Sequence, residues 1–216
     1  MTIQGWTTCD LANALGVLEI AGNDADNDEG HVQFGSGAQF KIDNGAGNTG
    51  KVMYEARFRT ESIADNGCAF FLGLGSAAAA GVGANTLVDD TGALITTGAF
   101  IGFQRLNDDG DKLDIIYQAA SQTLQQVEAN ALTLVANTWY KVGFVYDPSA
   151  DDAKKIVFYI DKADSGSYVT TTNLDAATFP EGEALIPLWL TKVGTAAEAK
   201  MQLDFVAAAQ YADGEE

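Results

Sequence analysis

Two runs of alternating apolar side chains, joined by a polar turn, constrain the fold of this chain most strongly. The runs lie at 140–146 and 156–160. Because strand side chains point alternately to opposite faces, each run places its largest side chains on one face. The residues that share this face are Tyr140, Val142, Phe144, Tyr146, Ile156, Phe158 and Ile160. The pattern predicts an antiparallel hairpin, and Val145, Val157 and Tyr159 on the other face predict that both faces contact protein.

The rest of the chain is also typical of a protein built from many short strands. It has 23 Gly and 3 Pro among 216 residues, and Gly, Asn and Asp separate short runs rich in Val, Ile, Phe, Tyr and Thr. Further strands are predicted at 51–59, 68–75, 100–105 and 113–118, the last two joined by a tight turn at Asp109-Gly110. With 47% hydrophobic residues, a chain of this length buries its core as one domain.

Short motifs in the central hairpin resemble those of a known superfamily. Trp139-Tyr140 opens a strand, Tyr146-Asp147 ends it, and the run 158–161 returns as Phe-Tyr-Ile-Asp. This arrangement resembles the central hairpin of the concanavalin A-like jelly rolls of legume lectins, laminin G domains and family 16 glucanases, and the run 201–206 resembles their last strand. The resemblance implies an all-β, two-sheet antiparallel jelly-roll β-sandwich. We expect a single domain over 1–216.

Two segments are expected to lie outside the regular strands. Residues 1–15 form an N-terminal arm, which packs on its own domain or reaches a neighbouring subunit. Residues 76–99 form a long Gly/Ala-rich loop. Loops longer than about 15 residues in compact domains are often functional, so this loop is a candidate contact loop; an excursion without function is the alternative.

The charge of the chain excludes several partners. Its 12 Lys+Arg against 30 Asp+Glu give a formal net charge of −18, which opposes binding to nucleic acid and to anionic membranes. No apolar run approaches the roughly 20 residues that span a bilayer. The N-terminus lacks the basic start and apolar segment of a secretory signal, so synthesis in a cytoplasm is expected.

An acidic segment near the N-terminus partly matches a calcium loop. Asp24, Asp26 and Asp28 have the i, i+2, i+4 spacing of such loops. Glu29 stands where the sharp turn needs glycine, and Gly35 stands where the bidentate acid should be. The sequence therefore favours a solvated acidic turn, and no metal or cofactor is expected.

The two cysteines do not suggest a disulfide framework. Cys9 and Cys68 lie far apart in the sequence, and cysteine is commonly buried as a free thiol. Two buried thiols are the favoured interpretation. A single Cys9–Cys68 disulfide is the alternative.

The predicted strand 51–59 carries much of the chain's positive charge on one face. Lys51, Arg57 and Arg59 share this face with Met53 and Glu55. Pairing with acids on neighbouring strands is the simpler expectation. A basic stripe for an acidic partner is the alternative.

The residues needed for glycan hydrolysis are missing. Family 16 glucanases carry two catalytic carboxylates in a Glu-x-Asp-x-Glu run on one strand, about 5 Å apart, and this sequence has no such run. Glu55 and Glu61 are six residues apart, with Arg57 and Arg59 between them. His31 is the only histidine, and no Gly-x-Ser-x-Gly elbow is present. We therefore expect a protein that is not an enzyme.

Trp189 is the candidate contact residue for a saccharide or protein partner. Glycan sites need an exposed aromatic platform, and Trp189 falls on the opposite face from Leu188 and Leu190. A tryptophan covered by a loop is nevertheless the favoured interpretation, since tryptophan is highly buried on average. Pro187 favours an edge strand or a strand start here.

An acidic jelly roll with an arm, a small-residue loop and no catalytic pair is similar to phage capsid decoration and head-fibre proteins. The similarity implies a non-enzymatic structural virion protein on the capsid exterior. Its expected partners are the major capsid protein or another virion protein, and a cell-surface glycan where the surface is lectin-like. A homo-oligomer is also expected. The alternatives are a carbohydrate-binding lectin-like module and, less favoured, a divergent family 16-type glycoside hydrolase.

Overall fold

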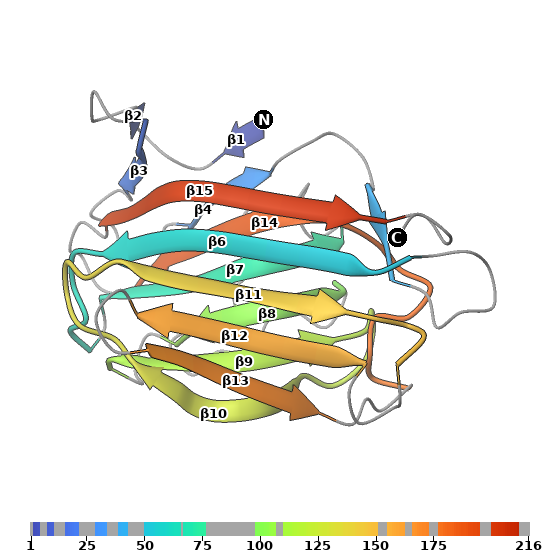
Figure 1. Cartoon of the computed structure of the whole chain (residues 1–216). Helices are drawn as coiled ribbons and strands as arrows, with labels where there is room; N and C mark the ends of the chain where they lie inside the picture. The colour runs from blue at the N-terminus through green and yellow to red at the C-terminus, as the bar shows by residue number, and fades with distance from the viewer. Residues whose placement is uncertain are drawn as a thin grey trace.

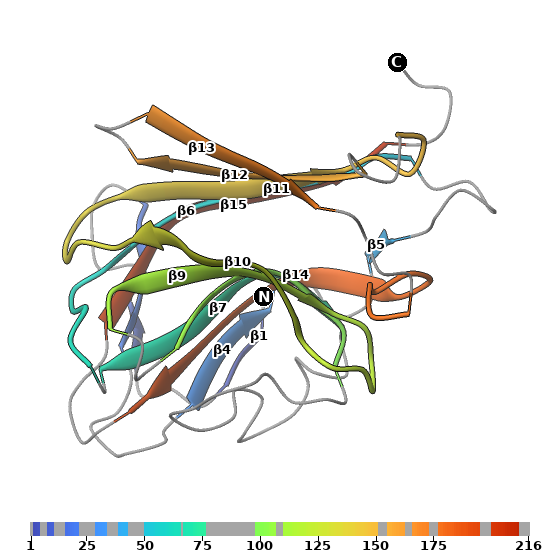
Figure 2. The ribbon, with the colours of Figure 1, turned by 90° about the horizontal axis from the view of Figure 1, so that it is seen from below.

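The computed structural model describes residues 2–4, 8–10, 16–21, 29–33, 39–42, 50–65, 67–76, 98–106, 110–150, 155–162, 166–172, 177–194 and 200–211. Every regular element among these residues is a β-strand, and all strand pairs are antiparallel. The strands form two sheets stacked face to face (Figure 2). The described part of the chain contains no helix that is long and apolar enough to cross a membrane. The predicted all-β sandwich is confirmed.

One sheet, here called sheet A, has the strand order β1-β4-β14-β7-β8-β9-β10, with β5 pairing β14. Its strands are β1 (Thr2–Gln4), β4 (Glu29–Gln33), β5 (Phe40–Lys41), β7 (Cys68–Ser76), β8 (Phe100–Arg105), β9 (Lys112–Gln118), β10 (Gln125–Thr133) and β14 (Ala184–Val193).

The other sheet, sheet B, faces the viewer in Figure 1 and has the order β13-β12-β11-β6-β15-β3-β2. Its strands are β2 (Thr8–Asp10), β3 (Leu18–Ala21), β6 (Val52–Thr60), β11 (Tyr140–Tyr146), β12 (Ile156–Lys162), β13 (Gly166–Thr172) and β15 (Lys200–Gln210). The predicted central hairpin is β11–β12, in unbroken register from Tyr140↔Lys162 to Tyr146↔Ile156.

The core lies between the two sheets. All seven residues of the predicted apolar face of the hairpin are buried in it. Phe103 of sheet A meets Phe158 of sheet B edge to face, with ring centroids 5.9 Å apart. Within sheet B, Tyr54 stacks on Phe144 at 5.5 Å. These rings are large apolar surfaces removed from water, which is the main source of stability in a sandwich of this size.

The expectation that both faces of the hairpin contact protein is wrong. Tyr159 on the outward face is 41% exposed, and Val145 and Val157 are only partly buried. No described element covers this face, which looks toward the viewer in Figure 1. The apolar residues on this face of sheet B therefore form an open surface.

A β-bulge in β15 changes which of its residues face the core. Leu203 pairs with Phe58, and Phe205 pairs with the next residue, Arg57, so Asp204 is the extra residue. Phe205 then faces outward, whereas strict alternation from Leu203 would have placed it in the core. Alternation alone, without the bulge, would therefore assign Phe205 to the core wrongly.

Pro187 is tolerated in the interior of sheet A because of a gap between two short partner strands. Ala184 and Leu185 pair with β5, and the pairing with β4 begins only at Leu188. Pro187 lies between these two stretches and pairs with Leu74 on the other side. Proline has no N–H to donate, and no described strand residue pairs with Pro187 on the β4/β5 side, so no ladder hydrogen bond is lost there. The edge strand predicted from the sequence is nevertheless wrong.

The described parts of the N-terminal arm belong to the sandwich, because β1 pairs with β4 and β2 pairs with β3. The rest of residues 1–15 lies outside the described residues. So does most of the candidate contact loop, at 77–97, and the possible calcium ligands Asp24, Asp26 and Asp28.

Candidate functional site

A shallow groove crosses the outward face of sheet B. Its volume is about 540 Å³, within the range of about 300–1,000 Å³ that is typical of small-molecule sites. The groove crosses the four strands β12, β11, β6 and β15 and continues to the residue after β15. The side chains that characterise it are Met53, Glu55, Lys141, Val145, Tyr159 and Tyr211.

One cross-strand row forms the middle of the groove. Tyr159 pairs with Gly143, Gly143 with Glu55, and Glu55 with Ala207. Neighbouring strands lie about 4.8 Å apart, so Tyr159 and Glu55 are separated by roughly 10 Å, with no side chain at Gly143 between them. A Cβ at 143 would lie 2.5 Å from the carbonyl oxygen of Tyr54. The strand pairing thus requires glycine here, and the glycine leaves the groove open.

An ion pair provides the polar groups of the groove. Nζ of Lys141 lies 3.6 Å from Oε2 of Glu55, and the two side chains are 43% and 47% exposed. An exposed pair of this kind contributes only about 0–1 kcal/mol to stability. It places a hydrogen-bond donor beside an acceptor on an otherwise apolar floor.

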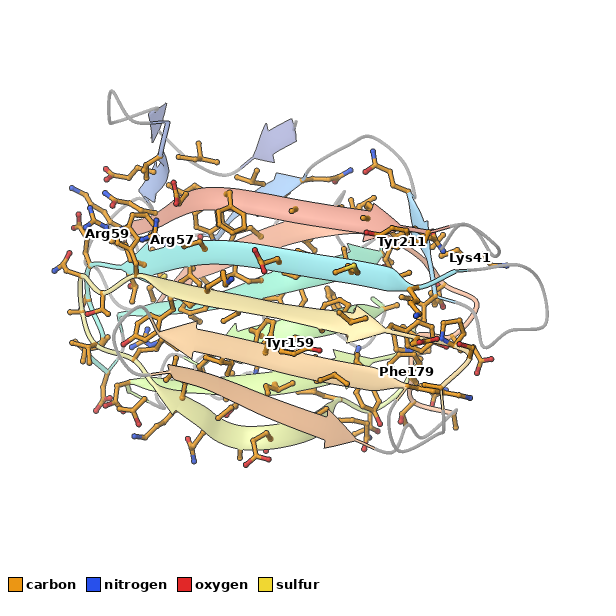
Figure 3. The ribbon with its side chains drawn as sticks, in the orientation of Figure 1. Lys41, Arg57, Arg59, Tyr159, Phe179 and Tyr211 are labelled. Atoms are coloured by element: carbon orange, nitrogen blue, oxygen red, sulfur yellow. The ribbon has the colours of Figure 1, made fainter. Side chains whose placement is uncertain are left out.

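Three large apolar side chains near this pair are exposed. Met53, Tyr159 and Tyr211 have exposed fractions of 39%, 41% and 47%. Figure 3 shows Tyr159 on β12 near the middle of the sheet and Tyr211 at the C-terminal end of β15. The groove therefore has one aromatic ring toward each end.

Cations flank the groove at the end opposite Tyr211 (Figure 3). The guanidinium carbons of Arg57 and Arg59 each lie 4.9 Å from the ring centroid of Trp139, which is a cation–π geometry. Arg57 also bonds Asp204 at 2.6 Å, and Arg59 donates to the side chain of Gln202.

Lys51, at the other end of the predicted basic stripe, pairs with Asp147 at 3.3 Å. Burial of Asp147 opposes its ionisation, but hydrogen bonds from Ser149 and Lys51 outweigh this and lower its pKa. The pairing with acids predicted for the stripe is confirmed for Lys51 and Arg57, whereas Arg59 bonds the amide oxygen of Gln202. An acidic partner for the stripe stays a prediction.

Trp189 does not form part of this surface. Its exposed fraction is 0%, and its indole Nε1 donates to Sδ of Met201 at 3.1 Å. The alternation on β14 is as predicted, but its two faces are exchanged: Trp189 faces the core between the sheets, while Leu188 and Leu190 face outward into a second buried cluster. Trp189 is therefore a core residue: the favoured interpretation of a buried tryptophan is confirmed, and the candidate aromatic contact platform there is wrong.

A second polar feature lies on the outward face of sheet A. His31, Gln104 and Asp114 stand in one cross-strand row, and Leu190 and Phe71 lie between His31 and Gln104. His31, Gln104 and Asp114 are 6%, 2% and 2% exposed. The side-chain oxygen of Gln104 is buried, with no hydrogen-bond partner in the described structure. This row is closed to solvent, so the open groove on sheet B is the stronger candidate site.

Asp114 has a structural role within that row. One carboxylate oxygen accepts a hydrogen bond from Nε2 of Gln126 at 2.8 Å, and the other accepts one from the backbone N–H of Asn130, also at 2.8 Å. Asn130 has a positive φ of 56°. Asp114 therefore holds the irregular edge strand β10 against β9.

The other residues considered from the sequence are dispersed. Glu61 follows the end of β6, and Glu55 pairs with Lys141, so the two glutamates are not brought together as a catalytic pair. Within the described ranges, no group of three or more His, Cys, Asp or Glu could hold a metal ion. Cys68 is a buried free thiol, and burial raises its pKa to about 11. The side chain of Cys9 lies outside the described residues.

Comparison with known proteins shows the fold of this chain but no relative by sequence. No protein-family model and no curated protein matches the sequence. Among solved structures, the chain is similar to the Lotus tetragonolobus seed lectin at 12% identity, with a TM-score of 0.62 over 98% of this chain and 93% of that one. Peanut lectin gives 14% identity and a TM-score of 0.62 over 98% and 91%.

The solved structure of an enzyme is about as similar to this chain as those of the two lectins are. The marine PL-14 alginate lyase from Aplysia kurodai is 8% identical, with a TM-score of 0.60 over 98% of this chain and 90% of that one. Identities this low establish architecture rather than activity. The chain therefore has the concanavalin A-like jelly-roll fold shared by lectins and by this lyase.

Proposed function

We propose that this chain is a non-enzymatic adhesion protein with a lectin-like fold, displayed on the exterior of a virus particle as a capsid decoration protein. The observation that carries the adhesive role is the groove on sheet B. It is open, lined by exposed Met53, Tyr159 and Tyr211, and its carboxylate, Glu55, is neutralised by Lys141. A surface of this composition suits binding more than bond cleavage.

Display on a particle is supported by the sequence. The net charge of −18 disfavours the interior of a capsid, where packaged nucleic acid would repel the protein. The major capsid protein or another virion protein is the proposed attachment partner, in a homo-oligomer that matches the symmetry of the particle.

Quantitative mass spectrometry of purified particles tests the display. We expect the protein in a fixed ratio to the major capsid protein, and we expect intact particles to bind an antibody raised against it. Its absence from purified particles, together with its presence in the lysate of infected cells, would reject the virion assignment.

A carbohydrate-active enzyme is the competing function, since the fold also serves an alginate lyase. Incubation with β-glucans and with polyuronates, assayed for new reducing ends and for unsaturated uronate products, tests this alternative. We expect no product above a heat-denatured control. Turnover that is lost in Glu55→Gln would overturn the proposal of a non-enzymatic protein.

A further inference from the structure

We propose that the groove on sheet B is a binding site for an uncharged pyranose saccharide, held between Tyr159 and the Glu55–Lys141 pair. The inference rests on the adhesive role proposed above and names the ligand class of the same site. It places the ligand on the outward face of sheet B, away from the closed polar row of sheet A.

The shape of the groove fits a sugar ring. Tyr159 and Glu55 occupy the same cross-strand row on either side of Gly143. Two strand spacings separate them by roughly 10 Å, and the missing side chain at Gly143 leaves room for a ring between them. On the far side of Glu55, Ala207 and Ala209 keep the floor low as far as Tyr211. The volume of about 540 Å³ allows more than one sugar unit.

The chemistry of the lining matches the two kinds of surface on a pyranose. The C–H face of a sugar packs on an aromatic ring, and Tyr159, at 41% exposure, offers such a ring together with a phenol hydroxyl. Adjacent hydroxyl groups need an acceptor beside a donor. Oε2 of Glu55 and Nζ of Lys141, 3.6 Å apart, supply them.

The charge of the groove favours an uncharged ligand. Glu55 and Lys141 compensate each other, and the nearby Arg57 is paired with Asp204 at 2.6 Å. An anionic sugar would have to displace an existing partner, in a chain whose net charge of −18 already repels it. A hydroxyl-rich neutral sugar bonds both members of the Glu55–Lys141 pair without separating their charges.

Titration of the full-length protein with methyl hexopyranosides and neutral disaccharides tests the site, with methyl glucuronide as the charged comparison. The readout is heat of binding or NMR shift changes at 141–145 and 157–160. We expect saturable binding of at least one neutral sugar, weakened at least tenfold in Tyr159→Ala and in Lys141→Met. Val157→Thr, on the same face of β12 but outside the groove lining, should stay within twofold of the parent protein.

Any of three binding results would overturn the inference. No neutral sugar binds; methyl glucuronide binds more tightly than every neutral sugar; or Tyr159→Ala and Lys141→Met bind like the parent protein, although denaturant titration shows that both variants are folded. A dimer that dissociates in Tyr159→Ala would also overturn it, because a second copy would then occupy the groove. Incorporation of Tyr159→Ala into particles separates this inference from the virion assignment. A variant that is incorporated normally leaves that assignment intact even if no sugar binds.

Discussion

Nε1 of Trp189 donates a hydrogen bond to Sδ of Met201 at 3.1 Å, and this contact joins β14 of sheet A to β15 of sheet B through the core. Both residues are 0% exposed. We expect Trp189→Ala to lower the free energy of unfolding by about 3–5 kcal/mol, because it leaves a cavity between the sheets. Denaturant titration measures this loss. Met201→Leu keeps the volume but removes the acceptor of the buried indole N–H, so it should cost less than Trp189→Ala, about 1–3 kcal/mol.

Gly143 should not tolerate even one added methyl group. In Gly143→Ala the new Cβ would lie 2.5 Å from the carbonyl oxygen of Tyr54 and would force β11 away from β6. We expect a loss of about 1–3 kcal/mol in unfolding free energy, which is typical of overpacking. The control is Gly182→Ala. A Cβ added at Gly182 would meet no atom within 4 Å, so any loss of stability there comes only from its φ of +75°. Equal stability of Gly143→Ala and the parent protein would contradict the account of the groove floor.

Arg105 holds three chain segments together at one end of sheet A. It is 1% exposed, Nε donates to the carbonyl of Gly110 at 2.6 Å, one terminal nitrogen donates to that of Ala64 at 2.8 Å, and the other donates to that of Cys68. Arg105→Met would remove this donor from all three carbonyls, of which that of Ala64 would keep the backbone N–H of Gly67 at 3.1 Å.

We expect Arg105→Met to lose at least about 3 kcal/mol of unfolding free energy, since each unsatisfied buried group costs about 1–3 kcal/mol. Hydrogen exchange should also increase at 62–68 and 110–113. Arg59→Met, which removes a partly exposed arginine, is the control and should change stability by under about 1 kcal/mol. A mild effect of Arg105→Met would mean that water replaces the guanidinium.

Cys68 should be unreactive in the folded protein. Burial raises its pKa from 9.0 to about 11, against the opposing charge of Arg105. In a Cys9→Ser background at pH 8, a shift of this size leaves roughly a hundredfold less thiolate than in the unfolded chain. We expect an aromatic disulfide reagent to label Cys68 only after denaturation. Rapid labelling under native conditions would show that the site is open.

The same shift gives Cys68 a pH-dependent effect on stability. Because the folded pKa is the higher one, the stabilisation is fully present below pH 9 and is lost as the pH rises toward 11. The measurement is the unfolding free energy of Cys9→Ser with and without Cys68→Ala at pH 8 and pH 10. The gap between the two proteins should narrow at pH 10.

The fold could be predicted from the sequence because inward and outward side chains alternate clearly on β6, β11 and β12. Alternation by itself does not tell which face is inward when both faces are apolar. On β14, Ile186, Leu188 and Leu190 match the core pattern as well as Trp189 does, and the structure buries both sets, in different clusters. The predicted contact residue therefore lies in the interior.

The groove does not follow from the sequence for a related reason. Val145, Val157 and Tyr159 predict a second buried face, although Lys141 and Glu55 on the same surface are charged and Gly143 lies between them. The sequence does contain one indication of the groove: Gly143 lies in the middle of the predicted strand 140–146, between Lys141 and Val145 on the same face. The cross-strand row with Tyr159 and Glu55 depends on the register of three strands and could not be deduced from any one of them.

The bulge at Asp204 makes the two faces of β15 depend on where a residue is lost rather than only on side-chain chemistry. Deleting Asp204 itself would place Phe205 directly after Leu203, so Phe205 would stay opposite Arg57 on the outward face, and Val206 and Ala208 would stay against the core. Loss of one residue elsewhere in β15 would turn the side chains that follow it to the other face. A shortened gene product would thus keep both faces of this strand when the missing residue is Asp204, and would lose only its ion pair with Arg57.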